Sequence, residues 1–129
     1  NERVYRDAED AGIFCNVVDR PSLCSFQVPA TVQRGDLQLA ISTRGSSPLM
    51  ARRMREQLEE EFGPEYAPLL QGLRDLRHAV QESYPDGGDR RRAALKEFMN
   101  SEVPDLMLEQ QDREAFEQAL QEWMRENLQ

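Results

Sequence analysis

Residues 13–56 decide the fold of this chain, and they read IFCNVVDRPSLCSFQVPATVQRGDLQLAISTRGSSPLMARRMRE. The stretch opens with the nearly continuous apolar run 13–18. Such a run is typical of a strand that is covered on both faces of a parallel sheet. Asp19 follows the run directly and begins a turn that is marked by Asp-Arg-Pro-Ser. The sequence therefore predicts a buried strand that ends in a carboxylate.

Two further strands joined by a tight turn are predicted next. Residues 37–43 alternate apolar and polar side chains, which is typical of a strand with one buried face. The strand before them, residues 25–33, contains Pro29, which confines it to a sheet edge or a bulge. We interpret the Arg-Gly-Asp sequence at 34–36 as the hairpin turn and not as an adhesion motif. A lone hairpin is marginally stable in water, so this one needs a partner.

The rest of the chain is predicted to be helical. Residues 1–10 have an apolar face and form one helix, which Gly12 ends. Ser47 as N-cap and Pro48 at the first helical position predict the start of another. Four amphipathic segments with short connections indicate a small helical domain. They cover 48–62, 65–82, 89–99 with Asp89 as cap, and the residues that follow the cap Asp112.

The composition limits the classes of partner. The chain has 129 residues, 24 acidic and 16 basic side chains, and a formal charge of −8. A nucleic-acid-binding protein needs a basic surface, so we expect no nucleic-acid partner. No apolar run approaches the roughly 18 residues of a membrane-spanning helix, so we expect no membrane partner.

The histidine and cysteine content limits the classes of site. Cys15 and Cys24 do not make a disulfide framework, and a reducing cytoplasm is the location that fits best. His78 is the single histidine and follows an apolar stripe on a predicted helix. Without a His/Cys cluster, the sequence predicts no resident metal site.

The stretch 13–56 resembles, nearly residue for residue, the middle of the precorrin-2 dehydrogenase/sirohydrochlorin ferrochelatase family, the siroheme synthases. A match spread over this length is far more specific than a short motif. The helices after residue 64 resemble the family only loosely. The shared pattern consists of Asn16-Val17-Val18-Asp19, Pro21, Leu23-Cys24, Phe26, Pro29-Ala30, Arg34 to Ile41, Ser42-Thr43, Gly45, Ser47-Pro48 and Ala51-Arg52.

The resemblance implies an α+β fold in three parts. Residues 1–24 would be the closing helix–strand unit of a Rossmann-like NAD-binding domain. Residues 25–62 would be a dimerisation segment of hairpin plus helix, which implies a homodimer, and residues 63–129 a helical C-terminal domain. The chain begins at Asn1 and has no Gly-x-Gly-x-x-Gly before the predicted strand. We therefore expect a C-terminal fragment, with NAD bound mainly by a missing N-terminal region.

The resemblance also implies two reactions on one tetrapyrrole substrate. The family oxidises precorrin-2 to sirohydrochlorin and passes a hydride to NAD. Many members then insert ferrous iron, which is a substrate and not a resident metal, to make siroheme. Asp19 occupies the position of a family aspartate that is implicated in both activities. The residue types agree, because ligands bind beyond the carboxyl ends of parallel strands and a carboxylate there can accept a proton. Spacing alone leaves open that Asp19 only starts an Asx turn.

The loop 42–47 is the second candidate site. It leads into a helix N-terminus, whose free N–H groups suit an anion such as a substrate carboxylate. Many relatives have Gly-Gly where this chain has Arg44-Gly45, so either the backbone differs there or Arg44 adds a cation. Thr43 aligns with a serine that is phosphorylated in some relatives. Arg52 either binds a substrate carboxylate or pairs with Glu56. The candidate substrate-binding residues are Asn16, Ser42, Thr43, Arg44, Ser46, Ser47 and Arg52.

Two other functions stay open at this point. Because the dinucleotide fingerprint is absent, the chain could be a tetrapyrrole-binding module without catalysis. It could also be only a homodimerisation module, in which Asp19 is a turn residue. In the first case the chain alone should not bind NAD. In the second it should dimerise through its C-terminal helices and not through the hairpin.

Overall fold

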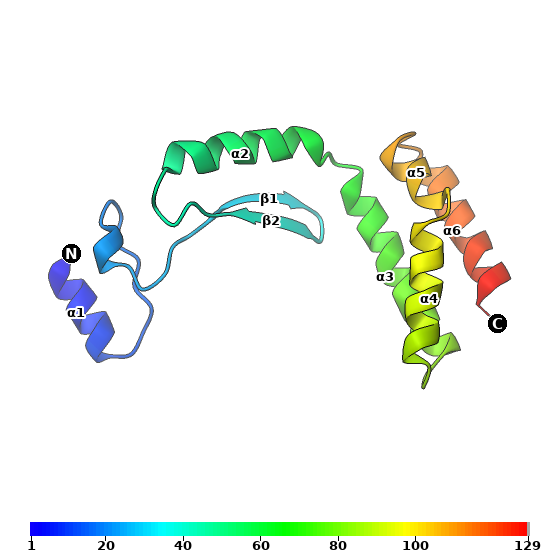
Figure 1. The fold of residues 1–129 in the computed structure, drawn as a ribbon, viewed down its shortest axis with the longest axis horizontal. Helices are drawn as coiled ribbons and strands as arrows, with labels where there is room; N and C mark the ends of the chain where they lie inside the picture. Colours follow the sequence, from blue (N-terminus) through cyan, green and yellow to red (C-terminus); the bar gives the residue numbers. More distant parts are fainter. Residues whose placement is uncertain (129) are drawn as a thin grey trace. The chain divides into compact units, whose positions relative to one another are not determined.

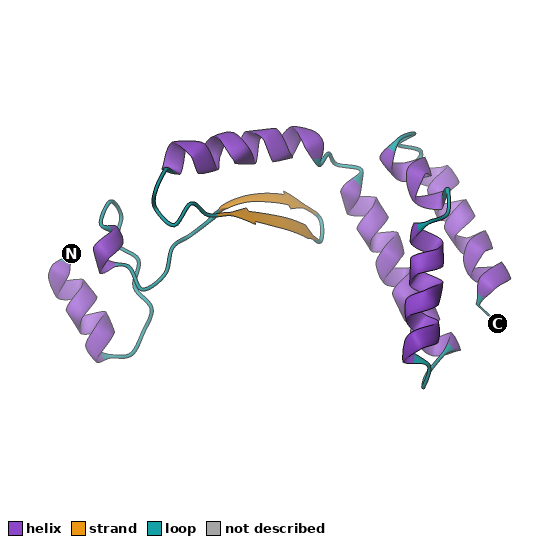
Figure 2. Cartoon of the chain, in the orientation of Figure 1, coloured by secondary structure: helices purple, strands orange, loops and turns teal. Residues whose placement is uncertain are grey.

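A computed structural model describes residues 1–128 and has the predicted α+β class (Figures 1 and 2). The chain divides into two compact units. The N-terminal unit comprises Asn1–Val32 and Leu39–Glu61, and the helical unit comprises Gln33–Gln38 and the chain from Phe62 onward. The elements are α1 (Glu2–Asp10), the 3-10 helix η1 (Pro21–Leu23), β1 (Ala30–Arg34), β2 (Leu37–Ile41), α2 (Pro48–Glu61), α3 (Tyr66–Ser83), α4 (Gly88–Met99), α5 (Val103–Leu108) and α6 (Arg113–Asn127).

The prediction of a buried strand at 13–18 is wrong. These residues form no strand, and Phe14 and Val18 are 83% and 78% exposed. The segment is instead tied to the chain ten residues later, because the Ser25 N–H donates to the Cys15 carbonyl at 2.8 Å. The physical reason is that no strand of the described residues lies beside this segment. The sheet of the described residues contains only β1 and β2, so nothing there offers 13–18 a ladder of hydrogen bonds.

The predicted hairpin is confirmed, although its first strand is shorter than expected. β1 begins at Ala30, directly after Pro29, which has no N–H to donate to the ladder. Gly35 opens the two-residue turn with φ +57°, a conformation that glycine adopts without strain. Val32 and Ile41 are the buried side chains of the two strands.

The tip of the hairpin is anchored within the helical unit. The Arg34 Nε donates to the Phe62 carbonyl at 2.8 Å, and Asp36 forms an ion pair with Arg74 on α3. A Cβ on Gly35 would lie 2.9 Å from the Cβ of Ala67. The turn therefore needs glycine for its close approach to α3 as well as for its backbone conformation.

Helix α2 begins where Ser47 and Pro48 predict. The Ser47 Oγ accepts a hydrogen bond from the Met50 N–H at 3.2 Å, which satisfies one of the free donors of the first turn. No residue of α2 is buried. Leu49, Met50 and Met54 are exposed. The helix therefore has an apolar surface without a partner in the described part of the chain.

The helical unit has a continuous core. Helices α3, α4, α5 and α6 pack around one cluster in which Leu76 and Phe98 are fully buried, and Trp123 lies edge-on to Phe98. The predicted cap Asp112 is confirmed, since its Oδ1 accepts from the Ala115 N–H at 3.0 Å. The other buried members are Leu69, Val80, Ala94, Met107, Phe116 and Leu120.

Within the helical unit one prediction was wrong and one helix was missed. Asp89 does not cap α4, because the helix starts one residue earlier with Gly87 as its N-cap residue, and Asp89 pairs with Arg92 at 3.0 Å. The six-residue helix α5 was not predicted. Such a short helix shows too little periodicity to be recognised.

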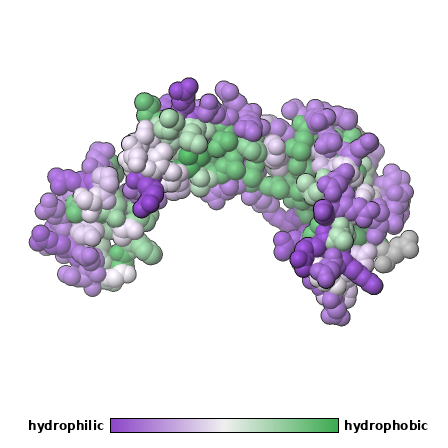
Figure 3. Space-filling view, in the orientation of Figure 1, coloured by the Kyte–Doolittle hydropathy of each residue, from purple (hydrophilic) through white to green (hydrophobic). Residues whose placement is uncertain are grey.

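The surfaces of α2 and of the C-terminal helices differ in hydropathy (Figure 3). Figure 3 shows apolar side chains gathered over α2 and the hairpin, whereas hydrophilic side chains cover most of the visible surface of the C-terminal helices. No helix among residues 1–128 is long and apolar enough to span a membrane.

Candidate functional site

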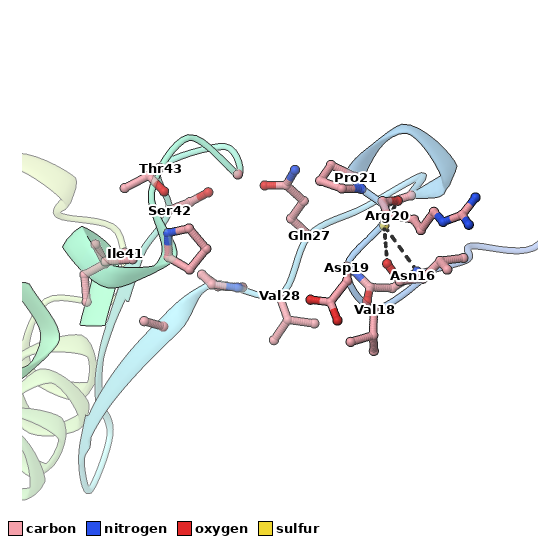
Figure 4. A pocket seen from close by; sticks show the side chains of 17 residues that line it. Asn16, Val18, Asp19, Arg20, Pro21, Gln27, Val28, Ile41, Ser42 and Thr43 are labelled. Atoms are coloured by element: carbon pink, nitrogen blue, oxygen red, sulfur yellow. Dashed lines mark hydrogen bonds between the residues drawn. The ribbon is translucent and has the colours of Figure 1, made fainter. Parts of the chain in front are cut away.

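A cavity of about 320 Å³ lies within the N-terminal unit. Its lining comes from the turn at 16–21, from Cys24, from the chain at 27–30, and from residues 41–43, Gly45 and the first turns of α2. Figure 4 shows Asn16, Asp19 and Arg20 on one side and Ser42 and Thr43 on the other. The cavity therefore brings together the predicted carboxylate and part of the predicted loop, which are more than 20 residues apart in the sequence.

Asp19 lines this cavity from a tight turn. The Arg20 N–H donates to the Val17 carbonyl at 3.1 Å and closes the turn. Asp19 occupies the third position with φ +61°. A left-handed conformation in a residue other than glycine costs of order 1 kcal/mol, although aspartate tolerates it better than most residues. The backbone is thus held in a conformation that it would not adopt freely.

The Asp19 carboxylate is exposed and has no partner in the part of the chain that the structure describes. No hydrogen bond or ion pair engages its oxygens within residues 1–128. The alternative in which this carboxylate starts an Asx turn is therefore wrong, because an Asx turn requires the side chain to accept from a backbone N–H two residues later. The oxygens stay available to a ligand or to a proton.

Asn16 also lines the cavity, but its amide already has a partner. The Nδ2 donates to the Phe26 carbonyl at 2.9 Å. The Ser25 hydroxyl joins the same segments, since the Cys15 N–H donates to the Ser25 Oγ at 2.7 Å and that hydroxyl donates back to the Cys15 carbonyl at 3.1 Å. Asn16 therefore fastens the 24–26 segment against the turn that carries Asp19.

The loop 42–47 is folded upon itself. The Thr43 Oγ1 accepts from the Ser47 N–H at 3.2 Å and donates to the Ser47 carbonyl at 3.1 Å. The Ser42 Oγ accepts from the Arg44 N–H at 3.2 Å. Arg44 has φ +53° and Gly45 has φ +82°, so the arginine does adopt the left-handed backbone that glycine favours.

The structure does not bring every predicted residue to the cavity. Ser42 and Thr43 line it, whereas Arg44, Ser46, Ser47 and Arg52 are outside the lining. The Arg52 Nε pairs with Glu56 at 3.0 Å, which is the structural alternative that the sequence left open.

Sequence reasoning missed Arg20, Cys24 and Gln27, which all line the cavity. Arg20 is the one lysine or arginine among the lining residues, and its Nη1 lies 3.4 Å from Glu2 on α1. Its position directly after Asp19 was the available signal, because an arginine beside a candidate site can bind a carboxylate in bidentate geometry.

The described residues contain no glycine-rich turn between a strand and a helix N-terminus. A pyrophosphate needs a glycine-rich turn between a strand and a helix N-terminus. Gly12 is the single glycine of residues 1–30, and it follows the C-terminus of α1. Residues 1–128 also contain no group of three or more His, Cys, Asp or Glu side chains able to hold a metal ion.

Three family models match successive parts of the chain. "Putative NAD(P)-binding" matches residues 1–30, "Sirohaem biosynthesis protein central" matches residues 34–61, and "Sirohaem synthase dimerisation region" matches residues 65–124. The last of these covers α3, α4 and α5 and most of α6. Its description thus attaches dimerisation to the helices, whereas the dimerisation segment predicted from the resemblance was the hairpin and helix at 25–62.

The chain is similar to curated and solved proteins as well. It is 38% identical over 103 residues to the siroheme synthases of Salmonella typhi and of Escherichia coli O1:K1 / APEC, which covers 80% of this chain. The chain spans only 22% of the length of these relatives. Among solved structures it is similar to SirC, a precorrin-2 dehydrogenase, with a TM-score of 0.59 and 28% identity, over 76% of this chain and 47% of that chain.

Proposed function

We propose that this chain, which belongs to the sirohaem synthase family, forms the substrate-binding and dimerising part of an enzyme that oxidises precorrin-2 to sirohydrochlorin in siroheme biosynthesis. The observation that carries the proposal is the Asp19 carboxylate, unpaired among the described residues, at a cavity that the matching segments 1–30 and 34–61 build together. The family similarity supplies the substrate class, and the cavity supplies a place for the chemistry.

Asp19 is the proposed catalytic base. Oxidation of a reduced tetrapyrrole removes a hydride and a proton, and the proton needs an acceptor within hydrogen-bonding distance. The Asp19 oxygens have no competing partner among residues 1–128, so they can take that proton. The same carboxylate can accept a pyrrole N–H proton if the whole protein also inserts ferrous iron as a substrate.

Recognition of the substrate carboxylates is proposed to start at Arg20. It is the cation among the lining residues, and its partner Glu2 is held only at 3.4 Å on an exposed surface. A substrate carboxylate can therefore displace Glu2 at little cost, because exposed ion pairs are weak. The other proposed substrate-binding residues are Asn16, Ser42 and Thr43 in the lining, and Arg44, Ser46, Ser47 and Arg52 around it.

NAD is proposed as the hydride acceptor of the whole enzyme. The described residues contain no glycine-rich strand–turn–helix unit that would hold its pyrophosphate. Each of the three predicted segments has a proposed role. Residues 1–24 complete a nucleotide-binding domain, residues 25–62 mediate dimerisation, and residues 63–129 form the helical domain. The cytoplasm is the proposed location.

The test of Asp19 uses the natural full-length polypeptide that contains this chain. Asp19→Ala and Asp19→Asn should each lower kcat for the conversion of precorrin-2 with NAD by about 10²- to 10⁴-fold, the usual contribution of a general base. Asp10→Ala is the matched control, because Asp10 is an exposed aspartate of the same unit outside the cavity lining. Unchanged turnover in both Asp19 variants would remove Asp19 from the mechanism.

The homodimer is proposed to form through the hairpin and α2. The exposed apolar side chains Leu49, Met50 and Met54 supply the surface, since large exposed apolar patches mark interaction sites. In sedimentation of the full-length protein, Leu49→Asp combined with Met54→Asp should weaken self-association at least about tenfold. Met99→Asp tests the other location, because Met99 is 48% exposed and lies within residues 65–124, which match the family's dimerisation region. Loss of the dimer in Met99→Asp alone would instead place the interface on the C-terminal helices.

A further inference from the structure

We propose that Cys24 is a positioning residue for Asp19. The Cys24 thiol holds the turn that carries Asp19 and takes no part in the chemistry itself. This inference depends on the proposed role of Asp19. Cys24 lines the same cavity as Asp19 and is half-buried. Cys24 comes directly after η1, so it is not a member of the turn 17–20 that it contacts.

The thiol contacts both ends of the turn. The Val17 N–H donates to the Cys24 Sγ at 3.2 Å. The Cys24 S–H can donate to the Val17 carbonyl or to the Arg20 carbonyl, each 3.3 Å from the sulfur. Figure 4 draws these bonds as dashed lines that end at the sulfur atom. Val17 and Arg20 are the first and last residues of the turn whose third residue is Asp19.

The contact matters because the turn is strained at Asp19. A residue with φ +61° persists only where the surroundings over-determine its backbone. The turn has one closing bond of its own, from the Arg20 N–H to the Val17 carbonyl. The thiol adds a donor and an acceptor at the same two residues, so it opposes any opening that would turn the Asp19 carboxylate away from the cavity.

Cys24 is itself well fixed for this role. Its N–H donates to the Pro21 carbonyl at 3.2 Å, and the Leu23 N–H donates to the Arg20 carbonyl at 3.0 Å. Ser25, the next residue, is bonded to Cys15 at the start of the same segment. The sulfur is therefore supported from both sides along the chain.

The experiment compares three substitutions in the full-length protein with precorrin-2 and NAD. Cys24→Val removes both hydrogen-bonding functions but keeps the site filled, with about one methyl group more than cysteine, and Cys24→Ala removes the sulfur without a replacement. Cys24→Ser keeps a donor and an acceptor. We expect kcat to fall about 10- to 100-fold in Cys24→Val and Cys24→Ala, because a displacement of about 1 Å at a reacting group can cost 10²-fold. KM should change by less than about threefold, and Cys24→Ser should recover most of the lost kcat.

A double-mutant cycle separates positioning from general stability. If Cys24 acts through Asp19, Cys24→Val should cause no further loss of kcat in an Asp19→Ala background. An equal loss in both backgrounds would overturn the inference. Cys15→Ala is the control, since the Cys15 sulfur makes no hydrogen bond within residues 1–128, and it should retain the wild-type kcat.

The remaining outcomes are equally decisive. Wild-type kcat in Cys24→Val overturns the inference, and so does a Cys24→Ser variant as slow as Cys24→Val. If Cys24→Ala does not fold, the comparison of the serine and valine variants still decides. If Asp19→Ala is fully active, the proposed function of Asp19 fails. A slow Asp19→Ala beside a fast Cys24→Val defeats only the positioning role.

Discussion

The two units of this chain treat their apolar side chains in opposite ways. The helical unit buries eight side chains in one cluster, and Met99 is its one large exposed hydrophobic residue among those described. The N-terminal unit has only Ala8, Val17, Val32 and Ile41 as buried hydrophobic residues. It exposes Val4, Ile13, Phe14, Val18, Phe26, Val28, Leu49, Met50 and Met54.

The difference shows which unit is complete by itself. Burial of apolar surface is the dominant favourable term in folding, and the helical unit obtains it internally. The N-terminal unit contains many large apolar side chains but leaves most of them exposed. An exposed set of this kind marks a surface that another polypeptide segment or subunit covers. The unit that contains the candidate site is thus the one that depends on further contacts.

The strongest test of the comparison is Phe98→Ala in the helical core. Phe98 has no exposed surface, so its truncation should lower the free energy of unfolding by about 3–5 kcal/mol. Urea unfolding followed by the fluorescence of Trp123, the single tryptophan, reports on this unit alone. Met99→Ala on the same helix should change the value by less than about 0.5 kcal/mol. Similar losses for both would mean that the core is not packed as described.

Gly72→Ala tests how closely α3 approaches α6. The new Cβ would lie 2.7 Å from the Phe116 ring and 2.9 Å from the Leu120 Cδ2. Overpacking lowers the free energy of unfolding by about 1–3 kcal/mol. The better helix propensity of alanine offsets up to about 1 kcal/mol of that loss. We expect a net loss of about 1–2 kcal/mol in the same fluorescence experiment. Gly88→Ala, where no atom lies within 4 Å, is the control and should show no loss.

Asp112→Ala tests the cap of α6. Loss of its hydrogen bond to the Ala115 N–H should cost about 1 kcal/mol. Asp89→Ala should cost less than about 0.5 kcal/mol, because Asp89 caps no helix and only pairs with Arg92 on the surface. Thermal melting of both variants distinguishes them, and a larger effect at Asp89 would reverse our assignment of the caps.

The smallest effect is expected in the N-terminal unit. Val28 is 73% exposed, so Val28→Ser should change the free energy of unfolding by less than about 0.5 kcal/mol. Val32→Ser, only four residues later, should cost more than about 1 kcal/mol because Val32 is 1% exposed. Far-UV circular dichroism during urea unfolding, at a concentration where the chain is monomeric, measures both. A large loss at Val28 would show that the chain covers this surface by itself.

Much of the secondary structure was predictable because its signals are local. Ser47 and Pro48 mark the start of α2, Asp112 caps α6, and Gly35 permits the tight turn. Each of these depends on contacts within about four residues along the chain. The failures at 13–18 and at α5 have the opposite cause, because a strand needs a distant partner and a six-residue helix shows too little of a period.

The candidate site divides in the same way. The amino-acid order alone shows that Asp19 follows an apolar run, that a polar loop precedes α2, and that both match one family pattern. Which side chains share the cavity emerges from the folded chain, in which Arg20 and Cys24 line the cavity while Arg44 and Arg52 lie outside it. The two kinds of information differ in range. Caps and turns are set by neighbouring backbone groups, whereas the lining of a cavity depends on how distant segments pack, and no short sequence window contains that information.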